Sequence, residues 1–175
     1  MELLNDIKNY EKLSPEQKNI LLAFLIAISS LLSLIDTIIT KPFIVKIGLA
    51  NIVTLILINE NRFKIAISVM LARVFISSIF SGTIFSLAFL LSLSGGVFSI
   101  IFSIIAKMFI KKATLIGISV IGSFFHIVGQ GLLIILIFGF TNSNVFIISI
   151  FCLISIATGI LTGIFASFVY RENNQ

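Results

Sequence analysis

The sequence has little of what enzymes use for chemistry. Its 175 residues include one histidine, one cysteine and two aspartates, and only 11% of the residues are charged. Because Asp6 and Asp36 lie thirty residues apart, no aspartate cluster can hold Mg²⁺ against a diphosphate. One histidine and one cysteine cannot build a zinc site without acidic partners. We therefore predict no metal site and no cofactor.

Motifs for catalysis are also missing. The sequence has neither the G-x-x-x-x-G-K-[ST] phosphate loop of nucleotide hydrolysis nor a G-x-S-x-G nucleophile motif. The single Cys152 lies in an apolar run and cannot form an internal disulfide. The polar N-terminus, with four acidic residues, lacks the apolar core of a signal peptide. We expect no enzyme and no cleaved leader.

Apolar residues dominate what is present. The chain is 58% hydrophobic with a mean hydropathy of +1.21, and a soluble domain of this size could not bury so much apolar surface. We therefore predict an all-α integral membrane protein. The net charge of +5 comes from residues at the predicted helix ends, which favours anionic lipid headgroups over nucleic acid as the partner.

Charged residues divide the apolar sequence into segments. Lys64 and Lys107 flank 42 residues that hold one charge, Arg73. As one helix these residues would extend about 63 Å, twice the roughly 30 Å of a hydrocarbon core. Polar turns are expected at 81–83 and 141–144, and a capping box from Ser14 to Gln17 predicts the first helix start. Six helices are predicted, near residues 18–39, 43–59, 63–81, 83–107, 113–139 and 145–169.

The positive charges predict the orientation in the membrane. Six crossings place both termini on one side, and that side carries nine of the twelve Lys and Arg residues, against two on the other. Since cytoplasmic loops are rich in Lys and Arg, both termini should be cytoplasmic. We expect a cytoplasmic or interfacial N-terminal segment (1–17), in which Leu3, Leu4 and Ile7 could form a short interfacial helix. A six-helix transmembrane domain (18–170) and a cytoplasmic tail (171–175) would follow.

Five polar residues are predicted at the midplane or in the outer half of the membrane. Arg73 lies about 13 Å from Lys64 along a helix, and His126 roughly 20 Å from the inner end of its own helix. Such residues are costly in lipid and usually face the bundle interior or a watery cavity. The five are Asp36, Asn51, Arg73, His126 and Gln130.

Each of these residues has a structural and a ligand-binding interpretation. His126 and Gln130, one turn apart on one helix face, either join helices by hydrogen bonds or line a ligand site. Arg73, whose charge cannot be removed, either pairs with Asp36 or binds an anionic ligand. Asn51 either bonds to a neighbouring helix or contacts the ligand.

Three further pairs are candidates for function, and the first two also have a structural and a ligand-binding interpretation. Lys41 and Lys46 either reach lipid headgroups or stand at the mouth of an outer site. Two glycines in SLSGG, Gly95 and Gly96, either allow a close helix contact or cradle a ligand. The first helix also has two alanines four residues apart, a spacing that lets a partner helix approach closely. These are Ala23 and Ala27.

Four motifs together resemble one family. KIGLANIVTLI (46–56), ARVFISSIFSG (72–82), FLLSLSGG (89–96) and HIVGQ (126–130) occur in the order and spacing of the Gx transporter family, often labelled heptaprenyl diphosphate synthase component I. The resemblance covers roughly residues 20–170. Two positions depart from the pattern: Ile127 stands where the family usually has asparagine, and Asp36 where glutamate is more usual.

The resemblance implies a fold and a function. The family is similar to the six-helix substrate-binding S components of energy-coupling factor (ECF) transporters, which take up vitamins and related micronutrients across the cell membrane of bacteria. In S components, spaced alanines of the first helix contact the coupling subunit, a pattern that Ala23 and Ala27 match. The positions matching the family's motifs are Gly48, Leu49, Ala50, Asn51, Arg73, Gly95, Gly96, His126, Gly129 and Gln130.

Two functions are consistent with the sequence and with the resemblance. The first is capture of a small anionic molecule by Asp36, Lys46, Asn51, Arg73 and the later motif residues, with a coupling subunit and an ATPase pair as partners. The second is a non-catalytic membrane accessory subunit of isoprenoid or quinone metabolism, docking through its cationic inner loops. A solitary ion-coupled carrier fits less well, because Asp36 is the only carboxylate predicted near the membrane and it lies at a helix end.

Overall fold

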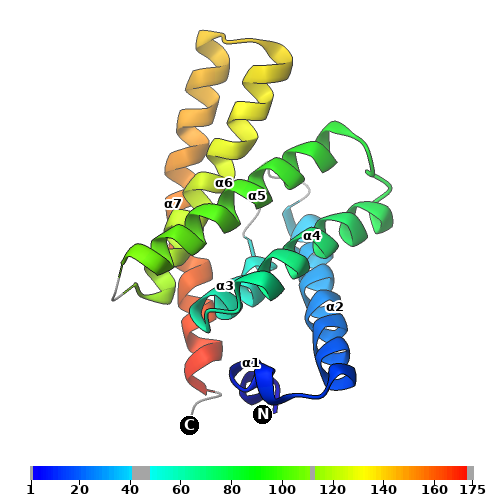
Figure 1. Ribbon diagram of the computed structural model, residues 1–175. Coiled ribbons are helices and arrows are strands. Elements are labelled where there is room, and N and C mark those ends of the chain that lie inside the picture. The colour runs from blue at the N-terminus through cyan, green and yellow to red at the C-terminus, as the bar shows by residue number, and fades with distance from the viewer. Residues whose placement is uncertain (1, 41–47, 111–112, 173–175) are drawn as a thin grey trace.

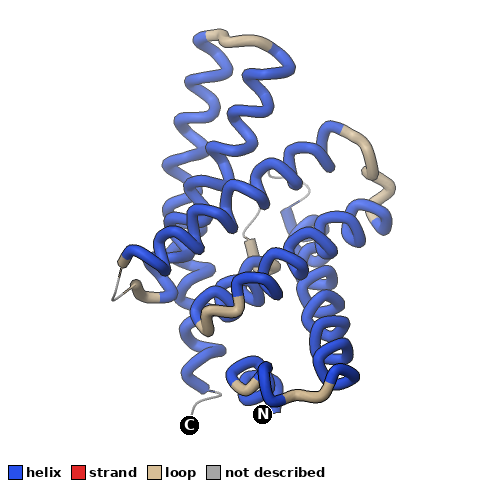
Figure 2. The backbone as a smooth tube through the Cα atoms, in the orientation of Figure 1, coloured by secondary structure: helices blue, strands red, loops and turns tan. Residues whose placement is uncertain are grey.

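The computed structural model describes residues 2–40, 48–110 and 113–172, and these are helical apart from short turns (Figure 2). No strand occurs in the described ranges, which confirms the predicted all-α class. The helices are α1 (Glu2–Lys8), the 3₁₀ helix η1 (Tyr10–Lys12), α2 (Pro15–Thr40), α3 (Asn51–Asn59), α4 (Phe63–Phe80), α5 (Leu87–Phe109), α6 (Leu115–Phe138) and α7 (Asn142–Glu172).

Five of the described helices are long and apolar enough to cross a membrane: α2, α4, α5, α6 and α7. Their outer faces expose large apolar side chains such as Phe80, Leu136 and Leu153. Apolar surface on this scale is unfavourable in water and suits contact with lipid. The protein is therefore membrane-embedded, as predicted.

Polar residues set the helix ends close to the expected positions. The backbone N–H of Ser14 donates to Gln17 Oε1 over 2.9 Å, and the N–H of Gln17 donates to Ser14 Oγ over 3.3 Å. This reciprocal pair is the predicted capping box at the start of α2. Turns at 81–86 and 139–141 separate α4 from α5 and α6 from α7, near the polar segments chosen from the sequence.

The second predicted helix, 43–59, is largely different in the structure. Residues 43–47 lie outside the described residues, Gly48 has a φ of +88° in a turn, and α3 begins only at Asn51. A helix of nine residues extends about 14 Å, less than half of a hydrocarbon core. Every residue from Val53 to Ile58 is buried, so α3 is a core helix surrounded by protein. A sixth crossing therefore stays a prediction.

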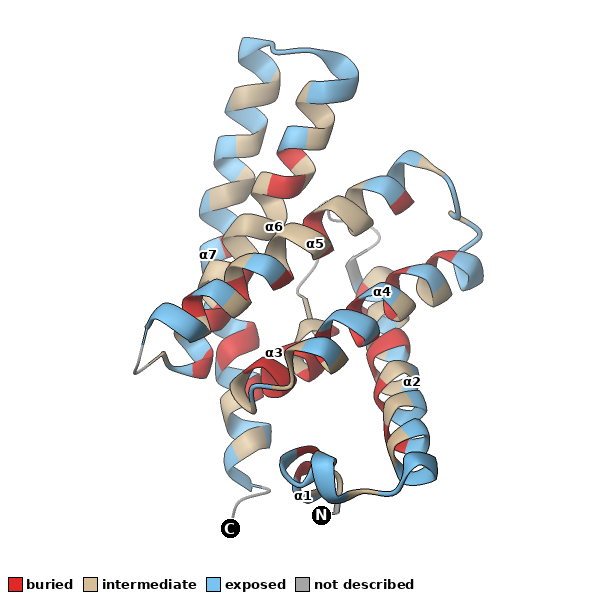
Figure 3. Ribbon diagram, viewed as in Figure 1, coloured by how far each residue is buried: buried red, intermediate tan, exposed pale blue. Residues whose placement is uncertain are grey.

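The longer helices enclose α3 (Figure 1). The helices α6 and α7 form an antiparallel hairpin, α5 packs across α6, and α4 lies between α5 and α2. Buried residues concentrate where α3 meets its neighbours, whereas the far end of the α6–α7 hairpin is mostly exposed (Figure 3). The Oγ of Ser29 in α2 donates to the carbonyl of Ala50 over 3.2 Å, which fixes the start of α3 against α2.

The N-terminal helix packs into the protein. Leu4 and Ile7 of α1 are only 5% and 2% exposed and belong to the hydrophobic core, so the predicted interfacial role of these side chains is wrong. The Arg62 guanidinium donates to the carbonyl oxygens of Ile7 and Lys8, which satisfies the C-terminal end of α1. Lys8 Nζ also lies 5.7 Å from the ring centre of Tyr170 in α7. The two ends of the chain thus meet at one end of the molecule.

Candidate functional site: a polar cavity between the helices

A cavity of about 440 Å³ opens between the helices at the end of α3 that begins with Asn51. We call it the main cavity. Its volume falls in the range of small-molecule sites in proteins. Five of the polar residues predicted from the sequence line it, although they come from four different helices: Asp36 (α2), Asn51 (α3), Arg73 (α4), His126 and Gln130 (α6).

Arg73 is the central charge of the main cavity. Its side chain is only 6% exposed, and its Nη1 donates to Asn51 Oδ1 over 3.0 Å. Asp36, which is 3% exposed, attracts the Arg73 charge electrostatically and accepts a 2.8 Å hydrogen bond from the N–H of Gly48 through Oδ2. The carboxylate therefore holds the turn before α3 while it partly compensates the guanidinium.

His126 and Gln130 of α6 form another part of the lining. The amide nitrogen of Gln130 lies 3.1 Å from His126 Nε2, a contact in which the amide donates when the ring carries its proton on Nδ1. A Cβ built on Gly95 of α5 would stand 2.8 Å from His126 Nε2 and 2.9 Å from the His126 carbonyl oxygen. The absence of a side chain at Gly95 therefore brings α5 against the histidine and fixes the position of the ring.

Gly95 and Gly96 do not line the main cavity. Gly95 serves the helix contact just described, and a Cβ on Gly96 would stand 2.9 Å from Met70 Sδ in α4. In the structure both glycines support close packing of α5, one of the two interpretations that the sequence left open. Lys46, the remaining predicted contact, and Lys41 lie outside the described residues.

Many hydroxyl groups in the lining were not singled out from the sequence. They project from α2, α4, α5 and α7 and from the turn after α4. Several recur three or four residues apart, which places them on one helix face; this spacing was the signal available in the sequence. The residues are Ser33, Thr37, Ser77, Ser78, Ser81, Thr83, Ser92, Ser155 and Thr158.

The lining has a defined chemistry. The lining contains one guanidinium, one carboxylate, two amides, one imidazole and many hydroxyl groups. The cavity therefore offers both charge and directional hydrogen bonds. The N-terminal end of α3 adds the positive end of a helix dipole. Within the described part of the chain, no three His, Cys, Asp or Glu side chains gather as metal ligands do. The arrangement suits binding of a small polar molecule.

Comparison with known proteins gives one match. Residues 25–169 match the family described as heptaprenyl diphosphate synthase component I. The chain belongs to this family. Neither a curated protein nor a solved structure matches the chain significantly.

The match to the heptaprenyl diphosphate synthase component I family covers α3, α4, α5 and α6 completely and most of α2 and α7. The whole lining of the main cavity therefore lies within the family's sequence. Both positions that depart from the motifs, Asp36 and Ile127, line this cavity.

Proposed function

We propose that the protein is the substrate-binding membrane component of an ECF-type transporter in a bacterial cell membrane, and that it takes up a small anionic micronutrient or precursor. The observation that carries this proposal is the buried Arg73 guanidinium in a cavity of about 440 Å³. A permanent charge inside a membrane domain is costly and is usually functional. A bound anion would compensate it.

The ligand's chemistry follows from the lining. Because Asp36 already compensates part of the Arg73 charge, the cavity suits a ligand with one anionic group more than a highly charged diphosphate. His126, Gln130 and the hydroxyl groups would bond to polar atoms in the rest of the molecule. We assign ligand contacts to Arg73, Asn51, His126 and Gln130, with Lys46 at the entrance and Asp36 as the residue that holds the turn.

The energy for uptake would come from an ATPase pair, which would act on this protein through a coupling subunit. Ala23 and Ala27 of α2 are exposed, whereas Leu21 and Leu25 of the same helix are buried. Small side chains on an outward-facing stripe let another membrane helix approach closely. We therefore place the contact with a coupling subunit on this face of α2.

Binding is tested by purification and affinity measurement. The protein should copurify with a small anionic molecule that mass spectrometry can identify. Binding of that molecule should fall by tenfold or more in Arg73→Ala and His126→Ala, and it should be unchanged in Arg171→Ala, which removes an exposed charge far along α7. Unchanged affinity in both cavity variants would refute the site.

A second function is favoured by the family description, which names a component of a synthase. In that role the protein would be a non-catalytic membrane subunit that recruits a soluble prenyl synthase. Affinity capture from the native membrane distinguishes the two functions, because an ATPase pair supports transport and a prenyl synthase alone supports the accessory role. Ala23→Leu and Ala27→Leu should release the ATPase pair, while Ala157→Leu, at another exposed alanine, should not.

A further inference from the structure

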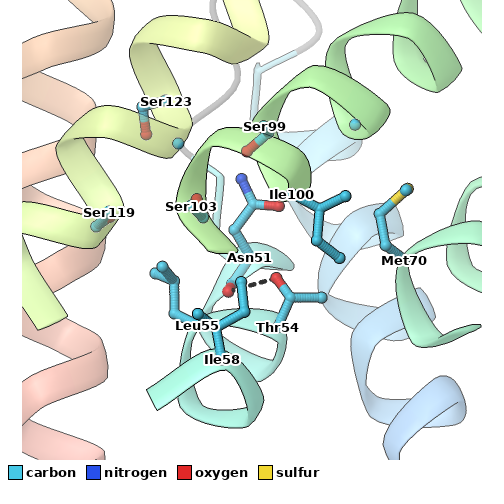
Figure 4. Close-up of a pocket in the computed structure, with 12 residues that line it drawn as sticks. Asn51, Thr54, Leu55, Ile58, Met70, Ser99, Ile100, Ser103, Ser119 and Ser123 are labelled. Atoms are coloured by element: carbon cyan, nitrogen blue, oxygen red, sulfur yellow. Dashed lines mark hydrogen bonds between the residues drawn. The ribbon is translucent and has the colours of Figure 1, made fainter. Parts of the chain in front are cut away.

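A second, much smaller cavity lies beside the main one, between α3, α5 and α6 (Figure 4). Its volume is about 20 Å³, and it shares Asn51 and Ser123 with the main cavity. The two cavities therefore adjoin at these two residues. The polar lining of the small cavity is otherwise made of hydroxyl groups, those of Thr54, Ser99, Ser103 and Ser119.

One hydroxyl group in the small cavity, that of Ser119, is buried without a hydrogen-bond partner among the described residues. The Ser119 side chain is 3% exposed. Leaving a buried hydroxyl without a partner is unfavourable. The Oγ atoms of Ser103 and Ser99 gather nearby, at 2.5 and 3.1 Å from where a Cβ of Gly122 would stand. Three hydroxyl groups therefore line the small cavity, where the absence of a side chain at Gly122 lets α5 and α6 approach closely.

Asn51 turns a hydrogen-bond donor toward the same space. A guanidinium can only donate, so the amide oxygen of Asn51 must face Arg73, as the 3.0 Å bond shows. The amide nitrogen is then directed to the other side, and Figure 4 shows it pointing toward Ser99. The small cavity thus receives one N–H₂ group together with hydroxyl groups that both donate and accept.

We propose that the small cavity binds a single structural water molecule that bonds to Ser119 Oγ and to the amide nitrogen of Asn51. The volume is that of a site for one water, and a water molecule can accept from the amide and donate to a hydroxyl. A metal cation fits poorly, because the lining has no carboxylate, presents an N–H₂ group, and lies next to the Arg73 charge.

The water would also orient the ligand site. A bond to the amide nitrogen holds the Asn51 side chain in the rotamer that bonds to Arg73, and so fixes the guanidinium in the main cavity. Ser119, which lines only the small cavity, is in this sense a positioning residue that acts on Arg73 through Asn51. This consequence rests on the proposed ligand-binding function, whereas the water site itself does not.

The water site is tested by thermal unfolding of ligand-free protein in detergent. If the water is present, Ser119→Ala removes one of its partners and lowers the melting temperature. If the site is dry, the same change removes an unsatisfied hydroxyl and raises the melting temperature. Ser30→Ala is the matched control, because Ser30 Oγ is equally buried, has no partner among the described residues, and lines neither cavity. A rise in Ser119→Ala like that in Ser30→Ala overturns the proposal.

A high-resolution structure tests the water site directly, even if a variant fails to fold. A high-resolution structure of the unsubstituted protein should show a density peak within hydrogen-bond distance of both Ser119 Oγ and Asn51 Nδ2; a cavity without such a peak overturns it. In ligand binding, Ser119→Ala should weaken affinity several-fold. Unchanged affinity overturns the positioning role alone, while the proposed function fails only if Arg73→Ala and His126→Ala also leave binding unchanged.

Discussion

Arg73 shows how one residue can link stability to binding. It keeps its charge at any physiological pH, yet it is almost completely buried. In the described structure its charge is met by one amide oxygen and by the field of Asp36. A buried guanidinium has five N–H groups to satisfy, so a bound anion would complete an environment that the protein provides only in part.

Replacing Asp36 with asparagine should test how far the buried Arg73 charge depends on the Asp36 carboxylate. Asp36→Asn keeps an oxygen for the N–H of Gly48 but removes the negative charge, so we expect a stability loss on the order of 1–3 kcal/mol. The proposed anionic ligand should raise the melting temperature more in Asp36→Asn than in the unsubstituted protein. Thermal unfolding with and without ligand measures both effects.

The control for that experiment is Glu172→Gln, which removes an acidic charge at an exposed position in the last turn of α7. It should change neither the melting temperature nor the ligand's effect on it. An equal ligand shift in Asp36→Asn and the unsubstituted protein would contradict the electrostatic account of the cavity.

At the scale of helices, glycines set the contact between α5 and α6. Gly95→Ala would place a Cβ within 3 Å of the His126 ring and backbone, so the helices must separate. We expect a loss of about 1–3 kcal/mol together with weaker ligand binding, because the histidine moves. Gly117→Ala in the first turn of α6 meets only Thr114 Oγ1, at 3.4 Å, and should be neutral or stabilising by up to about 1 kcal/mol. Thermal unfolding and ligand titration of both variants make the comparison.

The attachment of α1 depends on Arg62. The Arg62–Glu11 ion pair contributes little, because the Glu11 side chain is 85% exposed; the bonds to the carbonyl oxygens of Ile7 and Lys8 matter more. We expect Arg62→Ala to increase amide hydrogen exchange in α1 at least tenfold, while Lys64→Ala, an exposed cation two residues on, leaves it unchanged. Equal protection in both variants would show that the apolar contacts of Leu4 and Ile7 are sufficient.

The sequence predicted the long helices well and the short one poorly. Runs of apolar residues between charges located α4–α7, and the capping box at Ser14 located the start of α2, because both signals are local. The extent of α3 depends on the turn at Gly48 and on its bond to Asp36. Hydropathy does not reveal that contact between Asp36 and Gly48, so the sequence predicts a longer helix than α3.

The candidate site was predictable in its charged and amide residues but not in its full lining. Arg73, His126 and Gln130 stand out because polar groups are costly at membrane depth. Serine and threonine are common in membrane helices, where they can bond to their own backbone, as Ser155 does to the carbonyl of Cys152. Their share in the cavity therefore emerges only from the three-dimensional arrangement.

Orientation in the membrane is a property of the whole molecule. The distribution of Lys and Arg predicts that both termini are cytoplasmic, and the structure brings α1 and the end of α7 together. In a Cys152→Ser background, Asn5→Cys and Glu172→Cys should react with an impermeant maleimide only after the cytoplasmic face is opened. Ser143→Cys, in the α6–α7 hairpin, should react in intact cells. Labelling of Asn5→Cys in intact cells would reverse the orientation.

The short helix α3 is held at both ends by hydrogen bonds to or from side chains of longer helices. At one end Asn51 bonds to Arg73. At the other end Lys107 Nζ donates to Asn59, the last residue of α3, over 3.0 Å, and Tyr170 Oη donates to Glu60, the next residue, over 2.6 Å. Because both of its ends are bonded to longer helices, α3 connects Arg73 of α4 with Lys107 of α5 and Tyr170 of α7 through a single buried helix.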